Sequence, residues 1–171
     1  MKRMHIHVSV ENIQKSAAFY SKLFGTDPIV LKDDYAKWML DDPCVNFALS
    51  SHDGAHRGIE HVGIQVDDAE ELAEVYDRMR DAGQPIFDEG ATVCCYAQSD
   101  KNWTADPDGI AWEAFLTQGE ETEYGNRVDL DQLASAKAVA GSCCTPAVAP
   151  AGTGFANKHL AVDVSCCGEK P

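Results

Sequence analysis

The first half of the chain alternates apolar and polar residues like a strand and then repeats apolar residues at helical spacing. HIHVSV (5–10) has the period of a half-buried β-strand. The helical pattern opens at Asn12 or Glu11 and closes at Gly25, residue types suited to those helix ends. Two extended stretches follow: YAKWML (35–40) and VNFALS (45–50), joined by the turn-forming DDP.

The same order of elements returns in the second half. HVGIQV (61–66) again alternates in the strand period. Asp67 or Asp68 then opens a helical pattern that Gly83 ends. NWTAD and IAWEAFL follow as extended stretches, joined by Pro107-Asp108-Gly109, a strong turn signal.

The two halves match in register as well as in order. HIHVSVEN and HVGIQVDD align with His5 over His61, 56 residues apart, and Trp38 and Trp103 fall at roughly matching places. We interpret this as a duplicated βαβββ unit, because a repeated open unit can pair with its copy to bury a shared face. The predicted fold is α+β: two tandem βαβββ modules, about 3–52 and 59–118, form a curved, cleft-containing mixed sheet within a domain 1–120.

The remaining segment, 121–171, has a different character. GEETEYGN is acidic and typical of a loop, and from residue 141 onward Ala, Pro, Gly and Cys dominate without periodicity. We predict an acidic linker followed by a flexible tail. The tail carries two cysteine pairs that are accessory thiols at most: Cys143, Cys144, Cys166 and Cys167.

The duplication brings out three candidate metal ligands. His5 and His61 hold equivalent positions, and Glu113 is the charged residue in the otherwise apolar IAWEAFL, where burial without a cation would cost several kcal/mol. Two imidazoles and one carboxylate form the facial triad of non-haem Fe(II), with Mn(II), Ni(II) or Zn(II) as possible occupants. His7 is the rival of His5, since both share one face of the strand; the repeat register favours His5.

Composition and charge narrow the partners. The formal net charge is −14, which disfavours binding to phosphate backbones or anionic lipid. No apolar run approaches membrane-spanning length, and the start MKRMHIHVSV lacks the core of a signal peptide. We therefore expect a cytoplasmic protein that binds neither nucleic acid nor membrane, with its seven cysteines as thiols or metal ligands.

One cysteine pair lies inside the second module. Cys94 and Cys95 occur in EGATVCCYAQSD, and on an extended strand they would point to opposite faces. Both can reach one atom only if the backbone bends at this point. With Gly90 and several small residues, the stretch favours a mobile loop over the cleft rather than a strand of the sheet.

Over about residues 3–118, the chain resembles the vicinal oxygen chelate superfamily. The general marks are His5 fourteen residues before FY (19–20), His61 opening the second module, and DPDGIAWE with its terminal acid. The narrower match resembles the organoarsenical carbon–arsenic lyases and the related cadmium-induced proteins. It rests on FYSKLFGT (19–26), CCYAQSDKNW (94–103) and DPDGIAWEAFL.

The resemblance implies roles for individual residues. His5, His61 and Glu113 would hold Fe(II), although some relatives carry glutamine at the first position. Cys94 and Cys95 would bind a trivalent methyl- or aryl-arsenical, and O2 would serve to cleave the carbon–arsenic bond and release arsenite. Tyr96, Lys101 and Trp103 would shape the pocket wall, Trp103 being equally suited to the core. Related folds are often dimers, and the sequence leaves open whether the two modules close within one chain or across a homodimer.

Other functions compete with this one. A single-site glyoxalase would need a fourth ligand from the first module, where Asn46 is a poor candidate. Fosfomycin thiol transfer has no need of paired thiols, and an extradiol dioxygenase shares the same triad. The alternative from another class is a non-catalytic cadmium- or arsenite-binding resistance protein.

Overall fold

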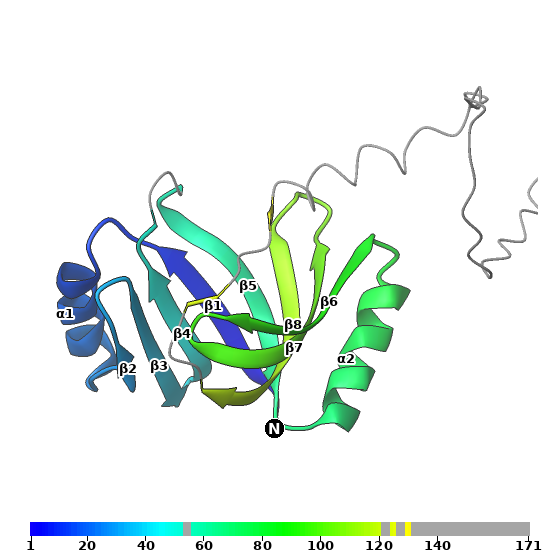
Figure 1. Ribbon diagram of the computed structural model, residues 1–171, viewed down its shortest axis with the longest axis horizontal. Helices are drawn as coiled ribbons and strands as arrows, with labels where there is room; N and C mark the ends of the chain where they lie inside the picture. The colour runs from blue at the N-terminus through cyan, green and yellow to red at the C-terminus, as the bar shows by residue number, and fades with distance from the viewer. Residues whose placement is uncertain (53–55, 121–123, 126–128, 131–171) are drawn as a thin grey trace, which may run out of the picture.

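The computed structural model describes residues 1–52, 56–120, 124–125 and 129–130. The described part forms one mixed sheet with strand order β2-β3-β4-β1-β5-β8-β7-β6 and two helices (Figure 1). The elements in chain order are β1 (Arg3–Ser9), α1 (Ile13–Phe24), β2 (Val30–Leu31), β3 (Tyr35–Asp41), β4 (Cys44–Ser50), β5 (Gly58–Val66), α2 (Ala69–Asp81), β6 (Ile86–Cys94), β7 (Ala97–Ala105) and β8 (Ala111–Glu120).

The topology confirms the predicted duplication. β1 and β5 pair antiparallel at the centre of the sheet, and each pairs in parallel with the last strand of its own module, β4 or β8. Figure 1 shows the curled sheet with α1 at one end and α2 at the other. The α+β fold of two βαβββ units is therefore present. In the described part of the chain, no helix has the length and apolar character needed to cross a membrane.

Both helices begin at the kind of residue that the sequence predicted. Asn12 caps α1 by accepting a hydrogen bond from the Lys15 backbone N–H at 2.8 Å, and Asp68 does the same for Glu71 in α2. Each helix buries an apolar stripe against its own half of the sheet. The buried stripe residues are Ile13 and Ala17 in α1 and Leu72 and Val75 in α2.

The two tryptophans differ by one residue in register. Trp38 pairs with Phe47, whereas Trp103 pairs with Glu113; the matching position in the first module is Lys37, opposite Ala48. Because a shift of one residue turns a side chain to the other face of a sheet, Trp38 packs with the α1 core and Trp103 faces the site.

The expected mobile loop around the cysteine pair is wrong for residues 89–94. These residues belong to β6, which pairs with β7 from Ile86 to Cys94 and carries one register shift between Asp88 and Gly90. The small residues thus belong to an edge strand with a bulge. The four predicted accessory thiols, Cys143, Cys144, Cys166 and Cys167, and most of the predicted linker and tail lie outside the described residues.

Candidate active site

Three histidines meet where the two modules join. His5 lies opposite Gly63, and His7 lies opposite His61, in the antiparallel pair of β1 and β5. The duplication therefore relates His5 to His61 and His7 to Gly63. All three imidazoles are buried, at 5%, 1% and 6% relative exposure for His5, His7 and His61. Burying a polar ring costs free energy unless hydrogen bonds or a bound ion compensate for the lost water.

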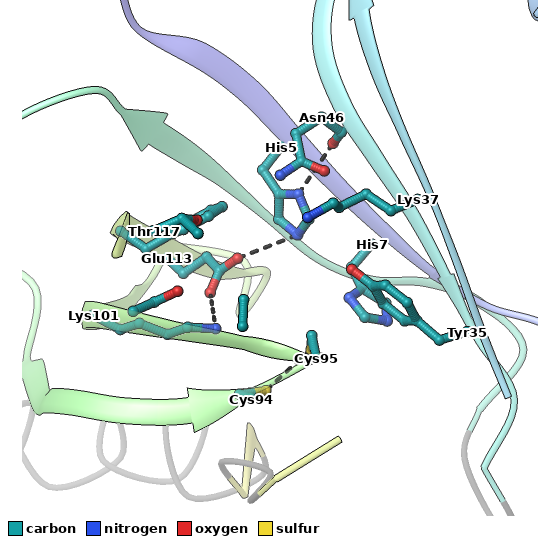
Figure 2. A pocket seen from close by; sticks show the side chains of 13 residues that line it. His5, His7, Tyr35, Lys37, Asn46, Cys94, Cys95, Lys101, Glu113 and Thr117 are labelled. Atoms are coloured by element: carbon teal, nitrogen blue, oxygen red, sulfur yellow. Dashed lines mark hydrogen bonds and ion pairs between the residues drawn. The ribbon is translucent and has the colours of Figure 1, made fainter. Parts of the chain in front are cut away.

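Glu113 reaches the histidines because Gly63 has no side chain. The two residues are neighbours in the parallel pair of β5 and β8, and a Cβ on Gly63 would lie 2.6 Å from Cγ of Glu113. The carboxylate is buried, with Oε1 3.2 Å from His5 Nε2 and 3.4 Å from His61 Nε2. Figure 2 shows Glu113 directed at His5.

The hydrogen bonding of His5 leaves a lone pair that faces a carboxylate. His5 Nδ1 is 3.0 Å from the backbone carbonyl of Asn46, which can only accept, so the proton lies on Nδ1. Burial lowers the pKa of His5 to about 4, and its Nε2 is then a bare acceptor at neutral pH. Two acceptors, Nε2 and the Glu113 oxygen, face each other, and a cation between them removes the repulsion.

The charges around Glu113 keep it ionised. Burial by itself would raise the pKa of Glu113, but the ammonium of Lys101 and then the imidazole of His61 hold that pKa well below its usual range. Lys101 is itself buried, with Nζ 3.3 Å from Glu113 Oε2. Metal ligands must be a deprotonated carboxylate and neutral imidazoles. The donor set of His5, His61 and Glu113 therefore fits a divalent metal.

His7 remains an alternative third ligand. The ring nitrogens of His5, His7 and His61 lie close enough, within 4.8 Å of one another, to hold a metal ion. However, His7 Nε2 is 2.8 Å from Ser50 Oγ and 3.4 Å from Glu60 Oε2. Only its Nδ1, buried without a hydrogen-bond partner among the described residues, is available. Both donor sets share His5 and His61.

The first module supplies no acid at the position that matches Glu113. His7 lies opposite Ala48 in β4, just as Gly63 lies opposite Glu113 in β8. The methyl group of Ala48 cannot bind a metal, and the Asn46 amide donates to Gln65 Oε1 at 2.9 Å. Ala48 therefore argues against the four-ligand arrangement expected of a single-site glyoxalase.

Cys94 and Cys95 lie at the turn between β6 and β7. Cys94 pairs with Ala97, so Cys95 and Tyr96 form a two-residue hairpin loop with φ values of 58° and 61°. Such loops normally carry Gly, Asn or Asp, and other side chains at positive φ cost on the order of 1 kcal/mol each or more. The bend brings the two sulfur atoms to 3.1 Å as free thiols.

One cavity joins the thiols to three of the candidate metal ligands, His5, His7 and Glu113 (Figure 2). Its wall includes Cys94, Cys95, His5, His7 and Glu113. Lys101 also lines it, whereas Tyr96 and Trp103 are not among its lining residues. The Tyr96 hydroxyl donates to Asp34 at 2.7 Å, and Trp103 packs its ring edge-to-face against His61 and donates to Glu89.

Two tyrosines of the site were not foreseen. Tyr35, at the start of β3, lines the cavity and is almost fully buried, and the Tyr124 hydroxyl lies 3.4 Å from Cys95 Sγ. The alternation of YAKWML could have placed Tyr35 on the face it shares with Lys37. Tyr124 lies in an acidic stretch without periodicity, so no pattern in the sequence signals it.

The two thiols differ in acidity. The hydrogen bond from Cys94, followed by the charge of Lys101, lowers the pKa of Cys95 to about 7, although burial opposes this. The same hydrogen bond, together with burial, raises the pKa of Cys94. Since the thiolate is the nucleophile, the lowered pKa of Cys95 favours it as the first of the two thiols to react.

This difference predicts a pH profile. We expect iodoacetamide to alkylate Cys95 before Cys94, with a midpoint near pH 7. Below that midpoint the thiolate is lost, and the rate falls about tenfold per pH unit; above it, the rate levels off. Peptide mass spectrometry after timed labelling measures both sites. Equal labelling of both thiols, with a common midpoint near ~8.5, would contradict the assignment.

Gly63 provides a structural test of the metal site. We expect Gly63→Ala to push Glu113 out of place, to lower metal affinity roughly 10- to 100-fold and to destabilise the fold by about 1–3 kcal/mol. Gly119→Ala is the matched control, because an added Cβ there meets nothing within 4 Å. Metal titration and thermal unfolding check both variants. Unchanged metal affinity in Gly63→Ala would show that Glu113 is not a ligand.

The fold and the site define a class of protein. Residues 2–114 match the Glyoxalase/Bleomycin resistance protein/Dioxygenase superfamily. The chain belongs to this superfamily.

Within that class, the chain is similar to several named proteins. It is 37% identical over 169 residues to the "Trivalent organoarsenical cleaving enzyme" of Bacillus sp. (strain MD1), covering 98% of this chain and 99% of the relative. It is 41% identical over 119 residues, 69% of this chain and 82% of the relative, to the "Probable trivalent organoarsenical cleaving enzyme" of Bacillus subtilis (strain 168). It is 27% identical over 154 residues, 90% of this chain and 100% of the relative, to "Cadmium-induced protein CadI" of Mycobacterium tuberculosis (strain ATCC 25618 / H37Rv).

Proposed function

We propose that this protein is an Fe(II)-dependent, O2-using carbon–arsenic lyase that converts trivalent organoarsenicals to arsenite. One observation carries the proposal: Cys94 and Cys95 line the same cavity as His5 and Glu113. A thiophilic substrate held by the sulfur atoms would lie beside the metal donor set. The relatives named as trivalent organoarsenical cleaving enzymes support the same activity.

The thiol pair matches the valence of the substrate. Methylarsenite carries one methyl group and two hydroxyl groups on arsenic, so two thiols replace both hydroxyl groups and two water molecules leave. The sulfur atoms are already 3.1 Å apart on a turn. Holding the substrate in one orientation accounts for much of the acceleration of a reaction between bound partners. The remaining bond of arsenic, the one to the methyl carbon, would then face the cavity.

His5, His61 and Glu113 would hold the metal, which supplies O2 chemistry when bound. The surrounding protein residues hold the ligand side chains in position for metal binding. Lys101 balances the Glu113 charge, and the Asn46 carbonyl fixes the tautomer of His5. Trp103 packs against His61 and buries it. These contacts hold the donor atoms in place without a rearrangement of the fold.

The overall conversion balances without an added reductant. Methylarsenite and O2 contain the atoms of arsenite, As(OH)3, and formaldehyde. Arsenic stays trivalent, while the methyl carbon gives up the electrons that reduce O2. The carbon–arsenic bond breaks, and both oxygen atoms of O2 are accounted for in the products. Reduced thiols are needed throughout, which agrees with the predicted cytoplasmic location.

Steady-state turnover tests the proposal. Protein loaded with Fe(II) without air is given methylarsenite and then air, and arsenite and formaldehyde are measured. We expect equal amounts of the two products, with O2 consumed in the same ratio and no dependence on an added reductant. Absence of both products, with thiol-dependent binding of cadmium or arsenite intact, would instead support a non-catalytic binding protein.

A further inference from the structure

Tyr124 contacts the thiol pair from beyond the last strand of the sheet. Its hydroxyl lies 3.4 Å from Cys95 Sγ. Together with Cys94 and Cys95 it lines a second cavity, whose wall also includes Glu60 and His61. The functional-site residues inferred from the sequence do not include Tyr124, and neither donor set for the metal uses it.

Ring contacts hold the Tyr124 side chain in place. Its ring packs edge-to-face against His52, Tyr96 and Tyr35, with centroid distances of 4.5, 5.6 and 6.0 Å. Aromatic pairs of this geometry are worth roughly 0.5–1.5 kcal/mol each beyond the area they bury. The hydroxyl is therefore held at Cys95 by contacts with both modules.

The backbone beside Tyr124 is fixed as well. Gly125 forms an isolated bridge with Cys94, and a side chain at Gly125 would collide with the carbonyl oxygen of Val93. Its φ of 78° also suits glycine. This close approach of the Gly125 backbone to the end of β6 fixes the position of Tyr124 relative to the turn formed by Cys95 and Tyr96, here called the thiol turn.

Cys95 Sγ thus lies between two hydrogen-bonding groups. The Cys94 thiol is 3.1 Å away on one side, and the Tyr124 hydroxyl is 3.4 Å away on the other. In the structure the Cys95 thiol donates to the Tyr124 hydroxyl. Once Cys95 is a thiolate, the Tyr124 hydroxyl and the Cys94 thiol can both donate to it. Among the described residues, the other titratable groups that line the two cavities with this sulfur are His5 and His7 of β1, Tyr35 and Lys37 of β3, Glu60 and His61 of β5, Lys101 of β7 and Glu113 of β8.

We propose that Tyr124 is a positioning residue that holds Cys95 Sγ beside Cys94 as a thiolate and so makes Cys95 the first sulfur to bond arsenic. The proposal rests on the proposed function. In the first step the Cys95 thiolate forms a sulfur–arsenic bond, an arsenic–oxygen bond breaks, and the departing hydroxide takes the Cys94 proton as water. The Cys94 thiolate then displaces the second hydroxide, which takes up the proton that Cys95 had released to solvent.

The test needs neither iron nor O2, so its failure is separate from failure of the lyase activity. In metal-free, full-length protein, we compare wild type with Tyr124→Phe, which keeps the ring and removes the hydroxyl. We expect the midpoint of Cys95 alkylation to rise by about one pH unit. Capture of one equivalent of methylarsenite at pH 7 should slow roughly fivefold, in line with the smaller thiolate fraction.

Tyr76→Phe is the matched control. It removes a tyrosine hydroxyl in α2 whose partner is Asp100 rather than a thiol, and Tyr76 does not line either site cavity. We expect its alkylation midpoint to match that of wild type. An unchanged midpoint and capture rate in folded Tyr124→Phe would overturn the proposal, and so would equal shifts in both variants, since these would not be specific to the Tyr124 hydroxyl. Circular dichroism establishes folding of each variant.

Discussion

Replacing Cys94 or Cys95 by serine is expected to reduce methylarsenite cleavage at least about 100-fold while leaving Fe(II) affinity nearly unchanged. A serine hydroxyl keeps the size of the side chain but is a poor partner for thiophilic arsenic. Neither sulfur belongs to either set of nitrogen and carboxylate donors. Arsenite release and Fe(II) titration, measured on the same preparations, separate the two effects.

Cys44→Ser is the matched control for both variants. Cys44 is the other free cysteine in the described part of the chain, and it lies in β4 with Sγ near the Lys2 carbonyl, not among the residues lining the site cavities. We expect wild-type turnover from it. Full turnover by either Cys94→Ser or Cys95→Ser would refute the docking role. A parallel loss of Fe(II) affinity would place the thiols on the metal instead.

Glu113→Gln is expected to have the second-largest effect, a loss of Fe(II) affinity of at least about 100-fold, with activity lost in step. The amide keeps the shape of the carboxylate but not its charge. It also leaves the Lys101 ammonium buried without its counter-ion, which costs about 3–5 kcal/mol of stability. Metal titration and thermal unfolding report the two consequences independently.

The double variant Glu113→Gln with Lys101→Met separates ligation from folding. Removing the buried ammonium should restore much of the lost stability, while Fe(II) affinity stays low. Glu60→Gln serves as the comparison near His7, and it should bind Fe(II) like wild type. If Glu113→Gln bound Fe(II) normally and His7→Ala did not, the metal would be held by the three histidines.

The sequence predicted the strands and their register wherever residue periodicity and the internal duplication applied. Alternation in HIHVSV and HVGIQV predicted β1 and β5, and the repeat register related His5 to His61. The position of Glu113 in the last strand predicted its approach to them. Strand pairing is regular, so equivalent positions in two copies converge on one axis. The ligand roles themselves remain predictions.

Sequence patterns could not predict the thiol turn at Cys95 and Tyr96. A two-residue hairpin loop with two positive φ values normally announces itself by Gly or Asn, whereas this one is built from Cys95 and Tyr96. Tertiary contacts hold it, namely Tyr96 with Asp34 and Cys95 with Tyr124. Such contacts join residues far apart in the chain. The local sequence therefore suggested a loop where the structure has a strand and a tight turn.

The absence of a side chain at Gly63 is a second feature on which the geometry of the site depends. Its counterpart in the first module is His7, and its own lack of a Cβ leaves the space that Glu113 occupies. In the first module the order is reversed: His7 fills that space, and Ala48 stands where an acid would be. Within the described residues, this exchange of large and small residues leaves space for a carboxylate beside the histidines in the second module and none at the matching place in the first.

A single turnover in protein with docked substrate tests the central claim most directly. Anaerobic Fe(II) protein is given one equivalent of methylarsenite, the unbound excess is removed by gel filtration, and O2 is added. If Cys94, Cys95 and the metal serve one site, about one arsenite and one formaldehyde form per methylarsenite bound at this thiol pair, and Cys94→Ser forms neither product. Recovery of intact methylarsenite from Cys94 and Cys95 of the wild-type protein after exposure to O2 would contradict the account.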